Sequence, residues 1–158
     1  MRSVFFIILL LSACGTKTKA MPYAELTPTE KARIALDAKD FPTAITLYKE
    51  AVAANPADYE SYRFLSAAYA EVGGFDILKA VSGSLGKAST SLIDSISAFL
   101  PADPTDDQIE AMHLATETLL SLPEEQRSNV HPEIPSASSG AQQLQFYQAA
   151  YSIIYLKK

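Results

Sequence analysis

The sequence lacks the residues that several kinds of site require. Trp is absent, His occurs twice, and the single Cys cannot close an intramolecular disulfide or build a multi-thiolate metal site by itself. Basic residues are also few, 13 against 18 acidic, and the net charge is -5. Because nucleic acid binding needs a basic surface, we expect no nucleic acid partner.

Long hydrophobic runs are missing as well. Apolar residues make up 48% of the 158 residues and charged residues 20%, which is enough for one compact domain. The apolar run at residues 4–11 is too short to cross a bilayer as a helix. It follows Arg2 and precedes small residues, a pattern typical of an export signal.

The only Cys of the chain follows shortly after this run. Leu11, the last residue of the run, is followed by Ser12, Ala13 and Cys14. They resemble the lipobox of bacterial lipoproteins, which are cleaved before the Cys. The resemblance implies diacylglycerol on the Cys14 sulfur and an acyl group on its amine. Several acyl chains together hold a protein durably on a membrane.

The lipobox predicts three segments and a location. We expect a signal peptide over residues 1–13, a lipidated Cys and tether over 14–21, and a helical domain over 22–158. Gly15, where an Asp would retain the lipoprotein in the inner membrane, favours the periplasmic face of the outer membrane. The alternatives are a signal peptide cut elsewhere, or an uncleaved helix that buries a free Cys.

An internal repeat with a period of 34 residues follows the tether. The matched pairs are Pro22 and Pro56, Ala32 and Ser66, Ala35 and Tyr69, and Phe41 and Phe75. This part of the chain resembles the tetratricopeptide repeat (TPR) family over about a third of the sequence. The residues that carry the resemblance are Phe41, Ala44, Tyr48, Ala51, Pro56, Tyr62, Leu65, Tyr69, Gly73 and Phe75.

The resemblance implies an all-α fold. Antiparallel helix hairpins would form a short right-handed α-solenoid of about seven helices, with a degenerate C-terminal half. Small residues such as Ala44 and Ala51 let neighbouring helices approach closely, with Tyr48 between them. Thr27 before Pro28, Pro42 and the pair Gly73-Gly74 mark helix ends.

Helical patterns continue where the repeat signature stops, after residue 78. We expect a small-residue hinge at 82–91 and helices over 92–100, from Thr105 to Pro123, and over 142–156, with a polar loop at 124–140. The last helix is apolar on more than one face. We expect Tyr147, Tyr151 and Tyr155 in the core, the alternative being an aromatic patch for a partner.

No motif predicts catalysis, a metal or a cofactor. Glu110 and His113 form Glu-x-x-His, but a di-iron site needs a second copy and further Glu residues, and the only other His is His131. The segment from Gly83 to Lys87 lacks the spacing of a phosphate-binding loop. We therefore expect a binding protein rather than an enzyme.

In TPR domains the first helices of successive repeats line a concave groove. The resemblance assigns this role to Arg33, Leu36, Asp37, Arg63, Ala67, Ala70 and Glu71. The expected function is a protein-interaction or assembly module of the bacterial envelope, held on the membrane by the Cys14 lipid. The alternative is a helical carrier with an apolar pocket for a small hydrophobic ligand. The sequence assigns no oligomeric state.

Overall fold

The computed structural model describes residues 22–77, 79–80, 91–127 and 135–158. Regular structure in these ranges is helical, which confirms the all-α class. The elements are η1 (Tyr23–Glu25), α1 (Pro28–Asp37), α2 (Phe41–Ala54), α3 (Tyr59–Val72), α5 (Leu92–Phe99), α6 (Asp106–Leu120), α7 (Glu124–Arg127) and α8 (Pro135–Leu156). Among them, none has the length and apolar character needed to cross a membrane.

Several predicted features fall outside the described residues. These are the export signal, Cys14 with the tether to residue 21, the segment from Gly83 to Lys87 and His131. The predicted hinge at 82–91 is described only at Ser91, whose side chain accepts a hydrogen bond from the Asp94 amide and so caps α5.

The predicted helix starts are confirmed by their caps. Thr27 accepts a hydrogen bond from the Glu30 amide, and the Glu30 carboxylate accepts one from the Thr27 amide at 2.8 Å. These bonds satisfy amides that a helix start leaves without partners, and they hold the pKa of Glu30 below its ordinary value. Thr105 and Gln108 form the same reciprocal pair at the start of α6.

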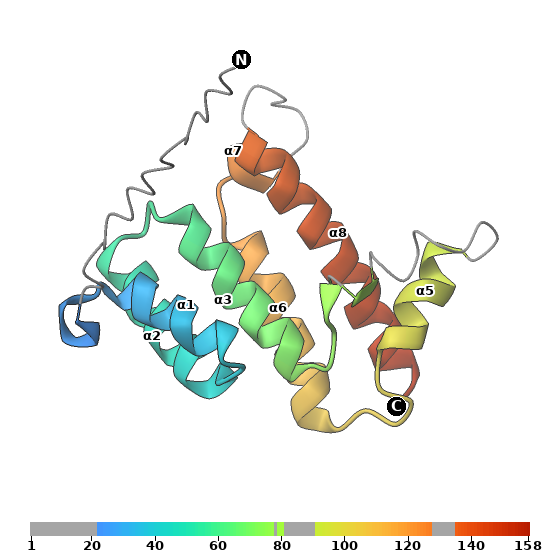
Figure 1. Ribbon diagram of the computed structural model, residues 1–158. Coiled ribbons are helices and arrows are strands. Elements are labelled where there is room, and N and C mark those ends of the chain that lie inside the picture. Colours follow the sequence, from blue (N-terminus) through green and yellow to red (C-terminus); the bar gives the residue numbers. More distant parts are fainter. Residues whose placement is uncertain (1–21, 78, 81–90, 128–134) are drawn as a thin grey trace, which may run out of the picture.

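Helices α1, α2 and α3 follow one another through short turns and pack side by side (Figure 1). The small residues of α2 lie at the contacts: Ala44 is fully buried, Ala51 is 5% exposed, and Tyr48 between them is fully buried. Leu65, Tyr69 and Phe75 are buried too, whereas Phe41 and Tyr62 are half-buried and Pro56 is exposed in a turn.

Helix α3 packs on its other side against α6, although more than thirty residues separate them in the sequence. The buried Ser66 hydroxyl of α3 donates to the Ala115 carbonyl of α6 at 2.6 Å. Near the end of α3, Gly73 lies against Met112 and Gln108 of α6. Since later residues of α3 meet earlier residues of α6, the two helices are antiparallel.

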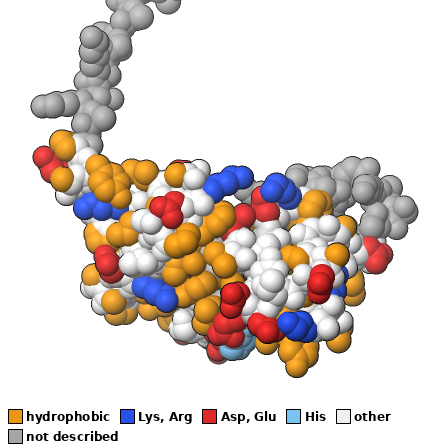
Figure 2. All heavy atoms as spheres, turned by 90° about the horizontal axis from the view of Figure 1, so that it is seen from below, with side chains coloured by type: hydrophobic (Ala, Val, Ile, Leu, Met, Phe, Trp, Pro, Cys, Tyr) orange, Lys and Arg blue, Asp and Glu red, His pale blue; other side chains and the backbone are white. Residues whose placement is uncertain are grey.

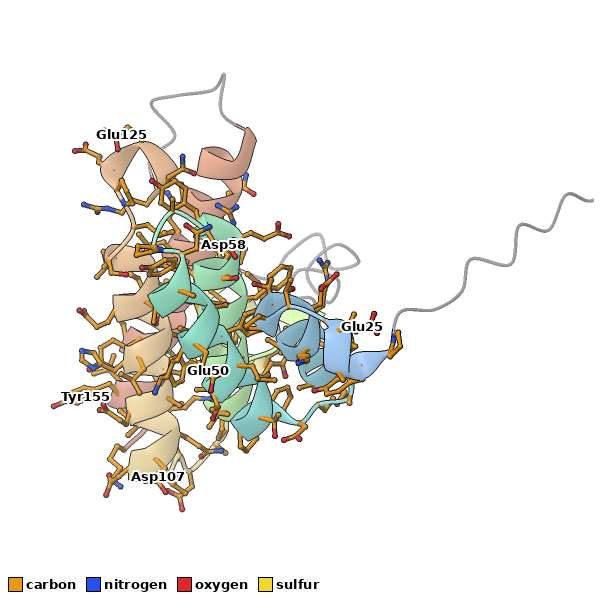
Figure 3. The ribbon with its side chains drawn as sticks, turned by 90° about the vertical axis from the view of Figure 1, so that its left-hand side faces the viewer. Glu25, Glu50, Asp58, Asp107, Glu125 and Tyr155 are labelled. Carbon is orange, nitrogen blue, oxygen red and sulfur yellow. The ribbon has the colours of Figure 1, made fainter. Side chains whose placement is uncertain are left out.

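Helix α8 packs on α6, α7 and α5, and its three Tyr residues differ in environment. Tyr147 is 1% exposed and meets Phe75 edge to face at 6.0 Å. Tyr151 is half-buried, and Tyr155 is 64% exposed and points away from the helices (Figure 3). The prediction of three core Tyr residues is wrong for Tyr155, because each four-residue step advances about 40° beyond a full turn.

The predicted polar loop over residues 124–140 is a second correction. Glu124–Arg127 forms α7, and α8 begins at Pro135 rather than at residue 142. Proline is tolerated in the first turn of a helix, where its missing amide has no partner to lose. Gly140 then allows α7 to approach α8, because a Cβ at this position would lie 2.5 Å from the Gln126 carbonyl oxygen.

The contact between α3 and α6 predicts an unusual response to Gly73→Ala. The Gly73 backbone is right-handed, with φ -67°, so its conformation suits Ala. On backbone grounds alone the substitution would stabilise the protein by about 0.4–1 kcal/mol, because Ala lowers the conformational entropy of the unfolded chain. The added Cβ, however, would lie 2.6 Å from Met112 Cγ and 3.2 Å from the Gln108 carbonyl oxygen. We expect a net loss of about 1–3 kcal/mol in chemical denaturation. A gain in stability would show that α6 does not pack here.

Candidate functional site

The candidate site is a groove along the face of α3 that neither α2 nor α6 covers. One hollow of about 280 Å³, here the α1–α3 hollow, lies between the end of α1, the start of α2 and the second half of α3. Its lining is Leu36, Asp37, Lys39, Phe41, Phe64, Ala67, Glu71, Asp76 and Ile77. A second, the α3–α8 hollow of about 310 Å³, is lined by Glu60, Arg63, Phe64, Ala67 and Gln143. Since Phe64 and Ala67 line both, the hollows form one groove.

The structure brings most of the predicted groove residues together. Leu36, Asp37, Ala67 and Glu71 line the α1–α3 hollow, and Arg63 and Ala67 line the α3–α8 hollow. Arg33 lies beside the groove, over the ring of Phe64 at 4.7 Å. Ala70 is the exception and a correction: it is fully buried in the core and offers no surface to a ligand.

A stack of three side chains from three helices lies at the edge of the groove. The Arg33 guanidinium of α1 covers Phe64 of α3 and pairs with Glu60 at 3.7 Å. Phe64 in turn stacks on Tyr48 of α2, with ring centroids 5.8 Å apart. Burial raises the pKa of Tyr48 to about 12, and its hydroxyl has no hydrogen-bond partner among the described residues. The stack therefore connects α1, α2 and α3 beside the groove.

The turn after α1 places a charged residue on the rim. The Lys39 amide donates to the Leu36 carbonyl and the Asp40 amide to the Ala35 carbonyl, both at 2.9 Å, which is a Schellman motif. Lys39 occupies the left-handed position of this motif, with φ 61°, where glycine is usual. Its ammonium-bearing side chain consequently lines the α1–α3 hollow beside Asp37.

Carboxylates outnumber cations around the α1–α3 hollow. Asp37, Glu71 and Asp76 line it with a single base, Lys39. Burial raises the pKa of the half-buried Glu71 above its ordinary value of 4.5, and the neighbouring charge of Asp76 acts in the same direction. The ionised Glu71 is thus less well stabilised in the folded protein than in water.

Sequence reasoning missed several lining residues, among them Phe64. The residues of α3 that line the groove stand at positions 60, 63, 64, 67 and 71, a regular helical stripe. The spacing of the predicted Arg63, Ala67 and Glu71 would therefore have identified Phe64 as their neighbour. No comparable signal was available for Gln143, whose side chain arrives from α8 and donates to the Arg63 carbonyl at 3.1 Å.

The Glu110 and His113 pair lies away from the groove, on α6. His113 Nδ1 is 4.0 Å from Glu110, its Nε2 is 3.9 Å from Glu117, and its ring lies 5.3 Å from Tyr151. Within the residues that the structure describes, no group of three or more His, Cys, Asp or Glu side chains is placed to hold a metal ion.

Comparison of the chain with known protein families, with curated proteins and with solved structures finds no match.

The raised pKa of Glu71 predicts how stability depends on pH. A carboxyl group with a raised folded-state pKa contributes stability that is present below its unfolded-state pKa and lost as pH rises through the folded-state value. Glu71→Gln should therefore raise the melting temperature by a few degrees or less near neutral pH, with the gain vanishing below about pH 4.5. Glu50→Gln, an exposed substitution on α2 (Figure 3), is the matched control and should change little. A lower neutral-pH melting temperature for Glu71→Gln would contradict this electrostatic assignment.

Proposed function

We propose that the chain is a lipid-anchored protein of the bacterial envelope whose helical domain binds another protein through the groove on α3. The observation that supports this role most strongly is the clustering of Leu36, Asp37, Ala67 and Glu71. These four residues come from two helices and line one hollow. The resemblance to the TPR family predicts such a groove, lined by the first helices of successive repeats.

We further propose that the domain contains one continuous TPR-like hairpin and one interrupted hairpin. Helices α1 and α2 are the first. Helix α3 begins the second, and α6, antiparallel to α3, takes the place of its second helix after an insertion that follows residue 78 and ends before Asp106. Such an insertion explains why the repeat signature in the sequence stops after residue 78. The α-solenoid expected from the family would then be limited to these two hairpins.

A protein partner suits the chemistry of the surface better than the runner-up, a carrier of a small hydrophobic ligand. The groove combines apolar side chains with charged rims, and on the lower face apolar side chains gather among dispersed charges (Figure 2). A cavity between α8 and α5 would favour a carrier. Both hollows described above lie instead along α3 and are open to solvent.

The anchor part of the proposal rests on the lipobox and is tested at Cys14. Cys14→Ser removes the only thiol that could carry the lipid, so the variant should incorporate no acyl label. The variant should then either appear in the soluble periplasmic fraction or accumulate as the uncleaved precursor. Metabolic labelling with a fatty acid followed by fractionation measures both effects. Equal acyl labelling of the variant and the natural chain would overturn the anchor.

The groove part is tested by photocrosslinking in intact envelopes. A photoreactive residue at Asp37, which is exposed and lines the α1–α3 hollow, should give discrete protein adducts. The same residue at Glu50, exposed on α2 and outside both hollows, is the control and should give none of these adducts. Ala67→Trp in the Asp37-labelled chain should fill the groove and remove them, while thermal melting checks that the variant folds. Adducts that persist with Ala67→Trp would place the partner elsewhere.

A further inference from the structure

The α1–α3 hollow has the form of a socket for one large apolar side chain. Its apolar lining comes from α1, α2, α3 and the chain beyond α3, through Leu36, Phe41, Phe64, Ala67 and Ile77. Its volume of about 280 Å³ is ample for one large apolar side chain, since a cavity of about 150 Å³ holds a benzene molecule.

The rim of the socket favours a positive charge beside that anchor. Asp76 pairs with Lys79 at 3.1 Å, which leaves Asp37 and Glu71 against the single Lys39 among the lining residues. Glu71 is half-buried, and its pKa is raised by burial and by the charge of Asp76 and lowered by the charges of Lys79 and Lys39. A cation from a ligand would offset this excess of negative charge, whereas a carboxylate would add to it.

We propose that the α1–α3 hollow binds a segment of a partner protein in which a large apolar residue is flanked by Lys or Arg. This assignment rests on the proposed function and specifies the chemistry of its partner. The apolar side chain enters between Leu36, Phe64 and Ile77. The adjacent cation meets Glu71 and Asp37.

The chain itself carries a segment of this composition, Tyr155-Leu156-Lys157-Lys158, with Tyr155 and Leu156 exposed. Both of its Lys residues are already engaged within the chain. Lys157 donates to the Ser97 carbonyl at 2.8 Å, and Lys158 pairs with Asp106. We therefore assign the socket to a different protein, and self-association becomes an outcome that would overturn the assignment.

The test compares three fluorescein-labelled Gly/Ser dodecapeptides for binding to the full chain, purified from membranes, by fluorescence anisotropy. The first carries Phe-Leu followed by two Lys, the second Phe-Leu followed by two Glu, and the third Ala-Ala followed by two Lys. The first should bind about tenfold more tightly than either of the others. The second peptide would lose two partly exposed ion pairs, and the third would lose one buried apolar side chain. Either loss is expected to weaken binding by about this factor.

Variants of the protein assign the preference to the socket. The double variant Glu71→Gln, Asp37→Asn should bind the Lys-containing Phe-Leu peptide about tenfold more weakly, and Glu50→Gln should bind it as the natural chain does. Equal or tighter binding of the Glu peptide, no binding of any peptide, or a concentration-dependent oligomer that depends on Tyr155 and Leu156 would each overturn the assignment. If the peptide results contradict the assignment but Asp37 still gives crosslinks in envelopes that Ala67→Trp removes, only the proposed chemistry of the partner is wrong. If these crosslinks are also absent, the proposed function is wrong as well.

Discussion

The structure depends on the close antiparallel contact between α3 and α6. The Ser66 hydroxyl bonds directly to the Ala115 carbonyl, and Gly73 leaves no room for a Cβ beside Met112. Small residues on α3 therefore let two helix backbones approach where larger side chains would hold them apart. Through α6, this contact also connects α3 to α8, whose Tyr147 completes the core against Phe75.

The groove follows from the same arrangement. Helix α2 covers one side of α3 and α6 another, so the stripe from Glu60 to Glu71 stays open between α1 and α8. Arg33, Phe64 and Tyr48 stack beside it and connect three helices. The socket at its end combines an apolar wall with the carboxylates of Asp37 and Glu71, and burial raises the pKa of Glu71. Such a surface suits a ligand that is both apolar and cationic.

Sequence reasoning identified what local chemistry determines. The caps at Thr27 and Thr105 need only residues within one helical turn, and the hairpin of α1 and α2 needs only a short turn. The groove residues were predicted from the family resemblance, which placed Ala70 on the wrong side of α3. The pairing of α3 with α6 has no local signal, because it joins residues far apart in the chain. For the same reason the contribution of Gln143 became visible only in the folded arrangement. The exposure of Tyr155, by contrast, follows from the helical drift of about 40° per four residues and could have been predicted.

Native-state hydrogen exchange tests the dependence of α3 on α6 most directly, since it measures the free energy at which each helix opens. If the two helices form one packed unit, the buried amides of α3 and α6, including those near Ser66 and Ala115, should share the highest opening free energy and respond together to denaturant. The α1–α2 hairpin should open at or below that value. An α6 whose amides exchange at a much lower free energy than those of α3 would contradict the arrangement on which the groove depends.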